Sequence, residues 1–249
     1  MKHLRLIGVA LVAVLAMSAV VVASASAAEP EFGRCKKEAG KFKDAKCDEE
    51  TGTEFNWVPL KAGEKVKYDS SSGAGTLETH NLEKITCTSD TNEGELTGPK
   101  SGTVVVTFLG CESSGFKCKS SGQAAGTIVT NTLETELGYI NAAKHEVGLS
   151  LKPKGELFVE FECVGGIIKV KTRGSVIGRM TPILEMSETS LLVFTKTGDP
   201  CSQEITAFEK LATDTLESSK NGGAFEGACE ETTDVITLLP AGELLEIKA

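Results

Sequence analysis

Apolar and polar side chains alternate along much of the chain, which is the two-residue repeat of a half-buried β-strand. The alternation is clear over 146–152 and 157–163, and the turn-forming sequence PKG at 153–155 predicts a hairpin between them. The sequence NGG at 221–223 predicts a second hairpin. Further strands are expected where β-branched and aromatic residues gather, at 103–109, 127–133, 167–172, 191–195 and 234–238.

Helical periodicity is scarce. Residues 203–215 offer one amphipathic helical face, but the threonines after Leu211 leave that assignment open. Strands therefore dominate, with turn signals between them and no alternation with long helices. We expect an all-β protein, an antiparallel sandwich or a barrel-like domain of about ten or more short strands.

The amino-terminal stretch has the three parts of a secretory signal peptide. Lys2, His3 and Arg5 form a basic start, an apolar run covers 7–23, and small residues occupy 25–27. A retained membrane anchor is the alternative, because about 17 apolar residues are near the lower limit for a membrane span. The sequence LLPAGELLEIKA at the other end has no second apolar span. We therefore expect an extracellular protein, secreted or loosely wall-associated, without a stable membrane anchor after cleavage.

The composition changes near Pro59, where a polar, lysine-rich stretch gives way to strand patterns. We expect three parts: a signal peptide over 1–27, a small cysteine-bounded segment over 28–60, and a β domain over 61–249.

The 249-residue chain has a formal net charge of −9. Residues 1–27 contain Lys2, Arg5 and no acid, so the rest of the chain has a charge of −11. Phosphate backbones repel such a surface, which argues against a nucleic-acid partner.

All 8 cysteines lie beyond the signal peptide, and an even number in an exported chain predicts disulfides. A metal site is the alternative, but zinc sites use close pairs such as C-x-x-C, and the tightest spacing here is Cys111 to Cys118. Eight cysteines allow about 105 pairings. Our predicted pairs join cysteines across turn-rich stretches, with one long-range bridge: Cys35 with Cys47, Cys111 with Cys118, Cys201 with Cys229, and Cys87 with Cys163.

Catalytic motifs are missing from the sequence. The serine-hydrolase elbow G-x-S-x-G is absent, because Ser175 stands in the wrong place in the glycine-flanked stretch 174–178. A metalloprotease needs two histidines one helical turn apart, whereas His145 is followed by a strand pattern and His80 is isolated. We therefore expect His145 in a turn and His80 on the surface, and we assign no catalytic residue, metal site or cofactor.

Carboxylates and aromatic residues offer weaker candidates. Glu160 and Glu162 share a strand face, but with 35 acids in the chain such pairs are expected by chance, so a solvated face is the better interpretation. The acidic stretch 90–95 lacks the full pattern of a calcium loop and is expected to be a turn. Trp57 is the only tryptophan, and we expect it in the core or as a lid over a disulfide rather than as a sugar platform.

One basic patch departs from the acidic background. It runs from Arg34 to Lys46, is bounded by Cys35 and Cys47, and has a local charge of +4 after Glu38 and Asp44 are subtracted. A disulfide would display these cations on a compact loop suited to an anionic cell-wall polymer. The alternative is a solvated loop neutralised by the acids at 48–50. The basic residues are Arg34, Lys36, Lys37, Lys41, Lys43 and Lys46.

Several short sequences resemble a group of exported proteins from high-GC Gram-positive soil bacteria, a group without an assigned function. The resemblance spans most of 30–178 and weakens beyond it, where Cys201 and Cys229 look like an addition. It implies export and a β-rich, cysteine-bridged body, and it transfers no catalytic residue. The sequences that carry it are PEFGRC at 30–35, the cysteine at 47, WVP at 57–59, ITC at 85–87, TFLGCE at 107–112, LGYI at 137–140 and GSVIG at 174–178.

Two functional hypotheses follow. The first is an exported, non-enzymatic structural or cell-wall-associated module. The second is an extracellular glycan hydrolase whose carboxylate pair is assembled only by folding. A stapled protease inhibitor is a third possibility, which requires a rigid protruding loop.

Overall fold

The computed structural model describes residues 29–80, 83–198, 200–209 and 211–249. The signal peptide predicted over 1–27 lies outside these residues. Strands dominate the described chain, which confirms the all-β prediction. Its helical pieces are two single 3-10 turns, η1 (Ala142–Lys144) and η2 (Val164–Gly166). The described part contains no helix that is both long and apolar enough to cross a membrane.

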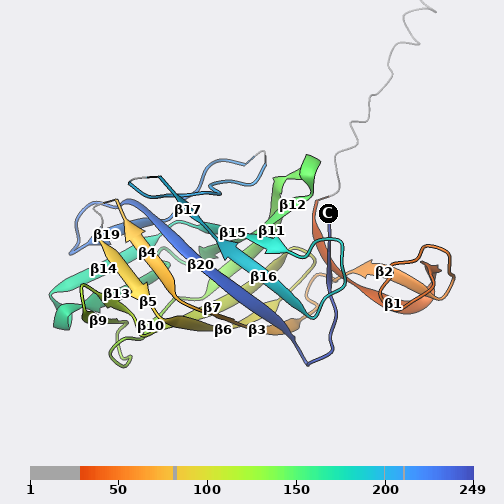
Figure 1. Ribbon diagram of the computed structural model, residues 1–249, viewed down its shortest axis with the longest axis horizontal. Coiled ribbons are helices and arrows are strands. Elements are labelled where there is room, and N and C mark those ends of the chain that lie inside the picture. Colours follow the sequence, from red (N-terminus) through yellow and green to blue (C-terminus); the bar gives the residue numbers. More distant parts are fainter. Residues whose placement is uncertain (1–28, 81–82, 199, 210) are drawn as a thin grey trace, which may run out of the picture.

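Eight strands of the described chain close into a barrel of antiparallel neighbours (Figure 1). The ring closes because the first and last strands of the hydrogen-bonded order also pair with each other, from Thr189 opposite Thr237 to Phe194 opposite Thr232. Closure leaves these strands without a free edge. In order they are β16 (Thr189–Phe194), β15 (Val176–Thr181), β12 (Glu146–Pro153), β11 (Leu133–Asn141), β7 (Ser101–Leu109), β6 (Ser89–Leu96), β3 (Val66–Ser72) and β20 (Glu226–Leu239).

The first half of β20 belongs to a second, smaller ring of short strands. It pairs with β19 (Glu217–Lys220) on one side and with β4 (Gly75–Thr79) on the other. The ladder between these two is continuous, so β20 is common to both rings. From β19 it passes through β14 (Ile168–Arg173), β13 (Val159–Cys163), β9 (Phe116–Lys119), β8 (Glu112–Ser113) and β5 (Lys84–Cys87).

The chain crosses between the rings several times through short breaks. Gly110 separates β7 from β8 with a φ of 65°, and Gly174 precedes β15 with a φ of 85°. These left-handed values favour glycine. A Cβ atom at Gly174 would also lie 2.0 Å from the carbonyl oxygen of Thr215. Glycine therefore permits both the bend and the close packing at this crossing.

The predicted hairpin at 153–155 is wrong, whereas the one at 221–223 is confirmed. β19 and β20 pair directly across the NGG turn. β12 and β13 both form, but β12 pairs with β11 and β15, and β13 pairs with β9 and β14. The connection between them is a crossing from one ring to the other, and local turn chemistry does not distinguish a crossing from a hairpin. A further small strand, β10 (Ile128–Val129), pairs with β7.

The sequence of 203–215 left a helix undecided, and the described residues of this stretch contain none. They form a loop that follows the short strand pair β17 (Lys196–Thr197) and β18 (Ser202–Gln203). Ile205 and Phe208 from this loop pack on Ile177 in a small apolar cluster. The Phe208 ring occupies the space above Gly138, where a Cβ would lie 2.6 Å from it. Their apolar spacing therefore reflects a loop that covers the outside of the barrel, and not a helix.

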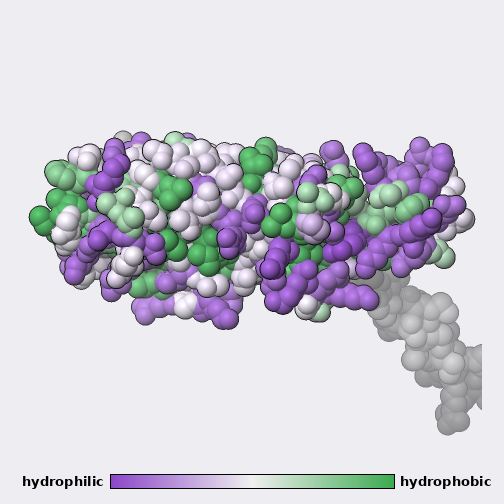
Figure 2. All heavy atoms as spheres, turned by 90° about the horizontal axis from the view of Figure 1, so that it is seen from below, coloured by the Kyte–Doolittle hydropathy of each residue, from purple (hydrophilic) through white to green (hydrophobic). Residues whose placement is uncertain are grey.

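The segment before residue 60 forms a hairpin that projects from one end of the barrel (Figure 1). β1 (Glu31–Phe42) pairs with β2 (Phe55–Pro59), and β21 (Glu246–Lys248) completes this separate sheet. Figure 2 shows the hairpin end as mostly hydrophilic, while the barrel surface mixes hydrophilic, neutral and hydrophobic side chains.

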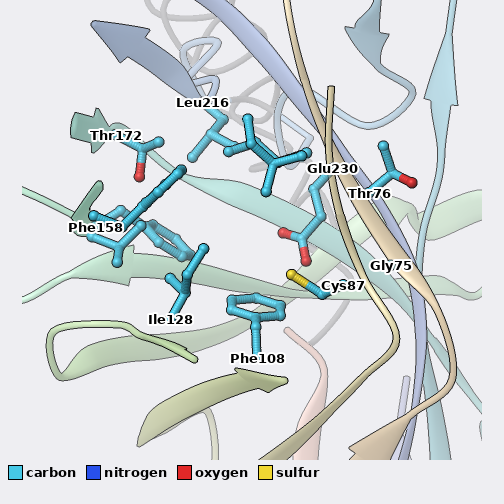
Figure 3. Close-up of a pocket in the computed structure, with 13 residues that line it drawn as sticks. Gly75, Thr76, Cys87, Phe108, Ile128, Phe158, Thr172, Leu216 and Glu230 are labelled. Atoms are coloured by element: carbon cyan, nitrogen blue, oxygen red, sulfur yellow. The ribbon is translucent and has the colours of Figure 1, made fainter. Parts of the chain in front are cut away.

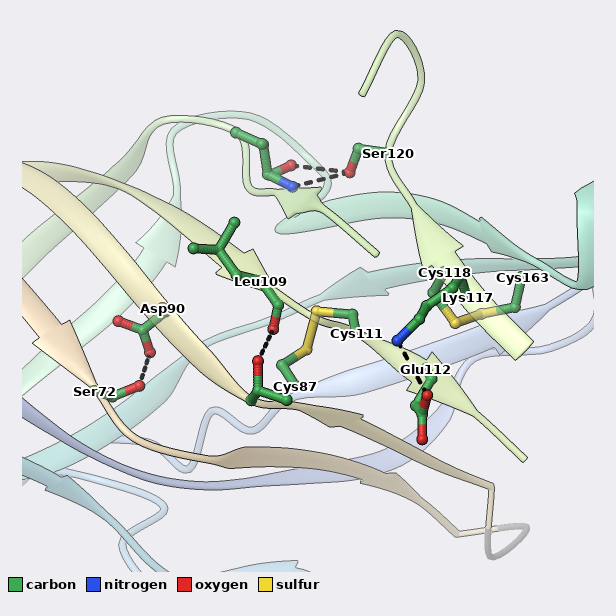
Figure 4. Close-up of a disulfide and its surroundings, with 12 residues drawn as sticks. Ser72, Cys87, Asp90, Leu109, Cys111, Glu112, Lys117, Cys118, Ser120 and Cys163 are labelled. Carbon is green, nitrogen blue, oxygen red and sulfur yellow. Dashed lines mark hydrogen bonds and ion pairs between the residues drawn. A yellow bond between two sulfur atoms is a disulfide. The ribbon is translucent and has the colours of Figure 1, made fainter. Parts of the chain in front are cut away.

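All eight cysteines form disulfides, and two of the predicted pairs are confirmed: Cys35–Cys47 and Cys201–Cys229. The predictions of Cys111 with Cys118 and of Cys87 with Cys163 are wrong. The observed pairs are Cys87–Cys111 and Cys118–Cys163 (Figure 4).

The strand register explains why Cys111 and Cys118 bond to other cysteines and not to each other. Cys111 and Cys118 do meet at the β8–β9 hairpin, where the Cys118 amide donates to the Cys111 carbonyl at 3.0 Å. Each cysteine bonds instead to the neighbouring strand on its other side. Cys163 lies directly opposite Cys118 across β9 and β13, with Cα atoms 4.1 Å apart. The two bridges therefore fasten the hairpin to both of its neighbours in the second ring.

The Cys118–Cys163 and Cys35–Cys47 disulfides are expected to stabilise different parts of the fold. Fluorescence of Trp57, the single tryptophan, follows the hairpin separately from the rings. Removing Cys118–Cys163, which spans 45 residues, by C118S/C163S should cost about 4 kcal/mol on the chain-entropy estimate and lower the guanidinium midpoint of the far-ultraviolet circular dichroism. Removing Cys35–Cys47 by C35S/C47S should shift only the Trp57 fluorescence transition, because Trp57 lies in the hairpin. Equal shifts of the dichroism midpoint in both variants would contradict this assignment.

Candidate functional site

The hairpin cations predicted to bind an anionic polymer are partly neutralised within the fold. Lys41 pairs with Glu50, and Lys43 lies 3.2 Å from Glu49. These two pairs match the alternative of a loop neutralised by the acids that follow it. The remaining ion-paired cation is Arg34, which contacts Glu64 at 3.2 Å and Glu243 at 2.8 Å.

Three hairpin cations have no ion pair among the described residues, namely Lys36, Lys37 and Lys46. Lys37 and Lys46 are exposed, and Lys36 is half-buried. These three lysines are the part of the predicted patch that is open to an external anion.

Trp57 packs against residues of β1 and β21. It lies directly opposite Cys35 in the β1–β2 ladder, and its ring covers Gly33. The Lys248 ammonium lies 4.6 Å from the ring centroid. The tryptophan is therefore half-buried beside the Cys35–Cys47 bridge, and a sugar stacked on its ring would compete with the Lys248 contact.

The other residues singled out in the sequence have structural surroundings. Glu160 and Glu162 form the predicted solvated strand face, with lysines at 3.6 Å and 3.9 Å from their carboxylates. His145 ends η1 with a φ of 53°, which confirms the predicted turn. His80 is exposed, as predicted, with its ring over Gly227.

The prediction of a turn at 90–95 is wrong, because these residues lie within strand β6. Asp90 and Asn92 point into the barrel and are 1% and 6% exposed. The inward positions of this stretch hold polar residues or glycine in place of apolar ones, so its sequence has the composition of a loop. The only sequence signal is the two-residue spacing of Asp90, Asn92 and Gly94, whose missing side chain makes room for the ring of Tyr68 on β3.

These residues belong to an interior polar cluster, defined here as Ser70, Ser72, Asp90, Asn92 and Asp234. They come from three adjacent strands, β3, β6 and β20. Asn92 Nδ2 lies 2.7 Å from Ser70 Oγ and 2.9 Å from an oxygen of each aspartate. Ser72 donates its hydroxyl to Asp90 (Figure 4). The cluster thus ties the three strands together through side chains as well as backbone.

Asp234 is hydrogen-bonded to Asp90 inside the barrel. Burial raises the pKa of Asp234 well above its usual range, and the charge and hydrogen bond of Asp90 raise it further. Asn92 opposes the shift by donating to Asp234. Because adjacent buried charges repel each other, Asp234 keeps its proton at neutral pH. Asp90 accepts hydrogen bonds from Ser72 and Asn92.

Glu230 and Asp234 lie on the same face of β20. The Glu230 side chain faces a cavity of about 50 Å³ (Figure 3). Apolar walls surround it, including Phe108, Ile128 and Phe158. Desolvation, and secondarily the charge of Asp90, raises the pKa of Glu230 to about 8. The glutamic acid is therefore protonated and neutral near pH 7.

The cavity is too small for a glycan. Its volume of about 50 Å³ has room for about three or four water molecules, whereas ligand pockets usually measure about 300–1,000 Å³. Water would also satisfy the Thr172 hydroxyl, which lines the cavity and has no protein hydrogen-bond partner. Asp90 and Asp234, whose carboxyl groups are suited to acid–base chemistry, are likewise enclosed in the barrel.

The buried acids make stability depend on pH. An unfolded glutamate ionises near pH 4.5, whereas folded Glu230 keeps its proton to about pH 8. Between these values the folded state binds more protons, so this group's contribution to stability falls as pH rises. E230Q should therefore raise the free energy of unfolding relative to the parent at pH 8.5 by on the order of a few kcal/mol, and by less at pH 5. The guanidinium midpoint should rise in the same order.

E160Q is the matched control, because Glu160 is on the solvated face of β13. It should change the midpoint by the same small amount at both pH values. An E230Q gain that is equal at pH 5 and pH 8.5 would show that Glu230 does not titrate inside the cavity. Comparing each variant with the parent at the same pH removes the opposing trend of acids such as Glu78, whose pKa the hydrogen-bonded Lys196 lowers.

Comparison with known proteins identifies no relative. No protein-family model, no curated protein and no solved structure matches this chain. The predicted resemblance to exported proteins of soil bacteria therefore stays a prediction.

Proposed function

We propose that the protein is an exported, non-enzymatic module that is structural or associated with the cell wall. The observation that carries the proposal is the enclosure of Asp90 and Asp234, the carboxyl groups that hydrogen-bond each other inside the described barrel. A carboxyl pair that no substrate reaches stabilises the fold instead of cleaving a glycan. Four disulfides support an oxidising extracellular environment.

The glycan-hydrolase alternative has less support. A glycosidase places two carboxyl groups about 5–10 Å apart on opposite sides of a bound sugar, with a route for the polymer to enter. The buried pair lies within one hydrogen bond, and the adjoining cavity beside Glu230 is smaller than a ligand pocket.

The hairpin supports association with an anionic wall polymer. It projects from the barrel end (Figure 1). Its Lys36, Lys37 and Lys46 have no ion pairs in the described chain. Acids on the same hairpin, including Glu49 and Glu50, reduce the local potential. The binding is therefore expected to be weak and sensitive to salt.

Co-sedimentation with purified Gram-positive cell walls tests the proposal. The protein without residues 1–27 should pellet with walls at about 20 mM salt and largely remain in solution at about 500 mM, because screening shortens the range of surface charges. K36Q/K37Q/K46Q should lose most of the low-salt binding. K152Q/K154Q/K169Q removes the same charge from exposed barrel positions and should bind like the parent.

Two results would count against the proposal. No pelleting at either salt concentration would exclude wall association, and release of reducing sugar ends from the walls would establish a hydrolase. Equal loss of binding in the two triple-lysine variants would mean that net charge, and not the hairpin, controls attachment.

A further inference from the structure

The outer face of the barrel carries a hollow of about 510 Å³ across β20, β3, β6 and β7. We call it the outer trough and define it by Asp69, Ser71, Thr91, Glu93, Thr107 and Thr237. These side chains alternate along their strands with buried ones, so they point away from the core. An adjoining hollow of about 380 Å³ shares Asp69 and Glu93 and extends the trough along the strands.

Hydroxyl groups line much of the trough. Ser71 lies directly opposite Thr91, and Thr91 lies directly opposite Thr107, so three hydroxyls form a row across β3, β6 and β7. Each hydroxyl can donate one hydrogen bond and accept two. The row therefore matches a ligand that itself carries many hydroxyl groups.

A pair of like charges lies in the next row. Asp69 and Glu93 are direct cross-strand partners on β3 and β6, and both side chains are exposed. Like charges in this position destabilise a sheet. The next pair on the same face has opposite signs, Lys67 opposite Glu95, and Glu95 also bonds Lys65 at 2.7 Å. Neither Asp69 nor Glu93 has an ion pair within the described residues.

From this combination we propose that the outer trough binds a glycan whose sugars carry free amino groups. An ammonium group against Asp69 and Glu93 relieves their repulsion, and the sugar hydroxyls bond to the row of Ser71, Thr91 and Thr107. The inference rests on the proposed function, because it names a ligand class for a wall-associated module. Valines such as Val105 and Val235 line the same hollow and offer apolar contact to the sugar ring.

The closed barrel favours a glycan over a cationic peptide. An extended peptide binds a sheet best by adding to a free edge, where its main chain is hydrogen-bonded. β3 and β6 each have hydrogen-bonded neighbours on both sides, as do β7 and β20. A peptide across the trough would therefore have only side-chain contacts, whereas a glycan needs no main-chain partner.

The exposed acids indicate binding and not cleavage. A glycosidase needs one carboxyl group held protonated in a desolvated setting so that it can act as general acid. Asp69 and Glu93 both lie on the solvent side of the sheet. They are suited to hold a cation by charge.

Calorimetric titration with a soluble chitosan hexamer tests the proposal, at pH 5.5 so that amino groups are protonated and exposed carboxyls ionised. The parent protein should bind this hexamer at least ten-fold more tightly than the fully N-acetylated hexamer. D69N/E93Q should weaken binding at least ten-fold. The matched control E134Q/E136Q removes two acids from β11 and should bind like the parent. Guanidinium unfolding of D69N/E93Q should show a midpoint no lower than the parent's, because the repulsion is gone.

Several outcomes would overturn the proposal. Equal binding of the two hexamers, equal binding by D69N/E93Q, or tighter binding of a lysine hexapeptide than of the chitosan hexamer would each exclude an amino-sugar site. Release of reducing ends from chitosan would make the trough a catalytic site instead. If the chitosan hexamer does not bind but the protein still pellets with cell walls, the trough assignment is wrong and wall association stands. If neither binds, both proposals are wrong.

Discussion

The double pairing of β20 is the constraint on which the architecture depends. Its second half closes the larger barrel against β16 and β3, and its first half closes the smaller ring against β19 and β4. One strand therefore removes the edges of two rings and aligns them along a common line. Because the same strand also presents Glu230 and Asp234 inward, closure places these carboxyl groups where water is scarce.

The interior follows from that placement. A barrel of this size is filled by side chains, and here part of the filling is polar. Three strands are joined by the hydrogen bonds of Asp90 and Asp234, with serine and asparagine donors around them. Such a network specifies one register, because a slip of one residue would move its members to the outside of the barrel. Because the pKa values of Asp234 and Glu230 are raised, the free energy of unfolding is expected to fall in alkaline solution.

Local patterns in the sequence predict the strands but not their partners. Alternation and β-branched runs locate β7, β14, β16 and the inner face of β20, and the NGG turn joins β19 to β20 as expected. The hairpin after β12 and two disulfide pairs fail for one reason: each depends on which strands become neighbours across the two rings. That choice is made by contacts between residues far apart in the chain, which a local pattern does not contain.

The candidate site is the least predictable part. Asp90 and Asn92 have the composition of a turn, and only their position between β3 and β7 shows that they form a strand. The same holds for Asp69 and Glu93, which become neighbours through the pairing of β3 with β6. The hairpin lysines are visible in the sequence because they are close together in the chain, and the ion pairs that neutralise some of them are local as well.

The place of β20 in the chain has a consequence for how the protein is made. Residues 226–239 follow all the barrel strands with which they pair, so neither ring can close until those residues have been synthesised. Long-range pairing of this kind is slow compared with local folding. The Cys201–Cys229 disulfide also has to wait for this strand, because Cys229 lies on β20.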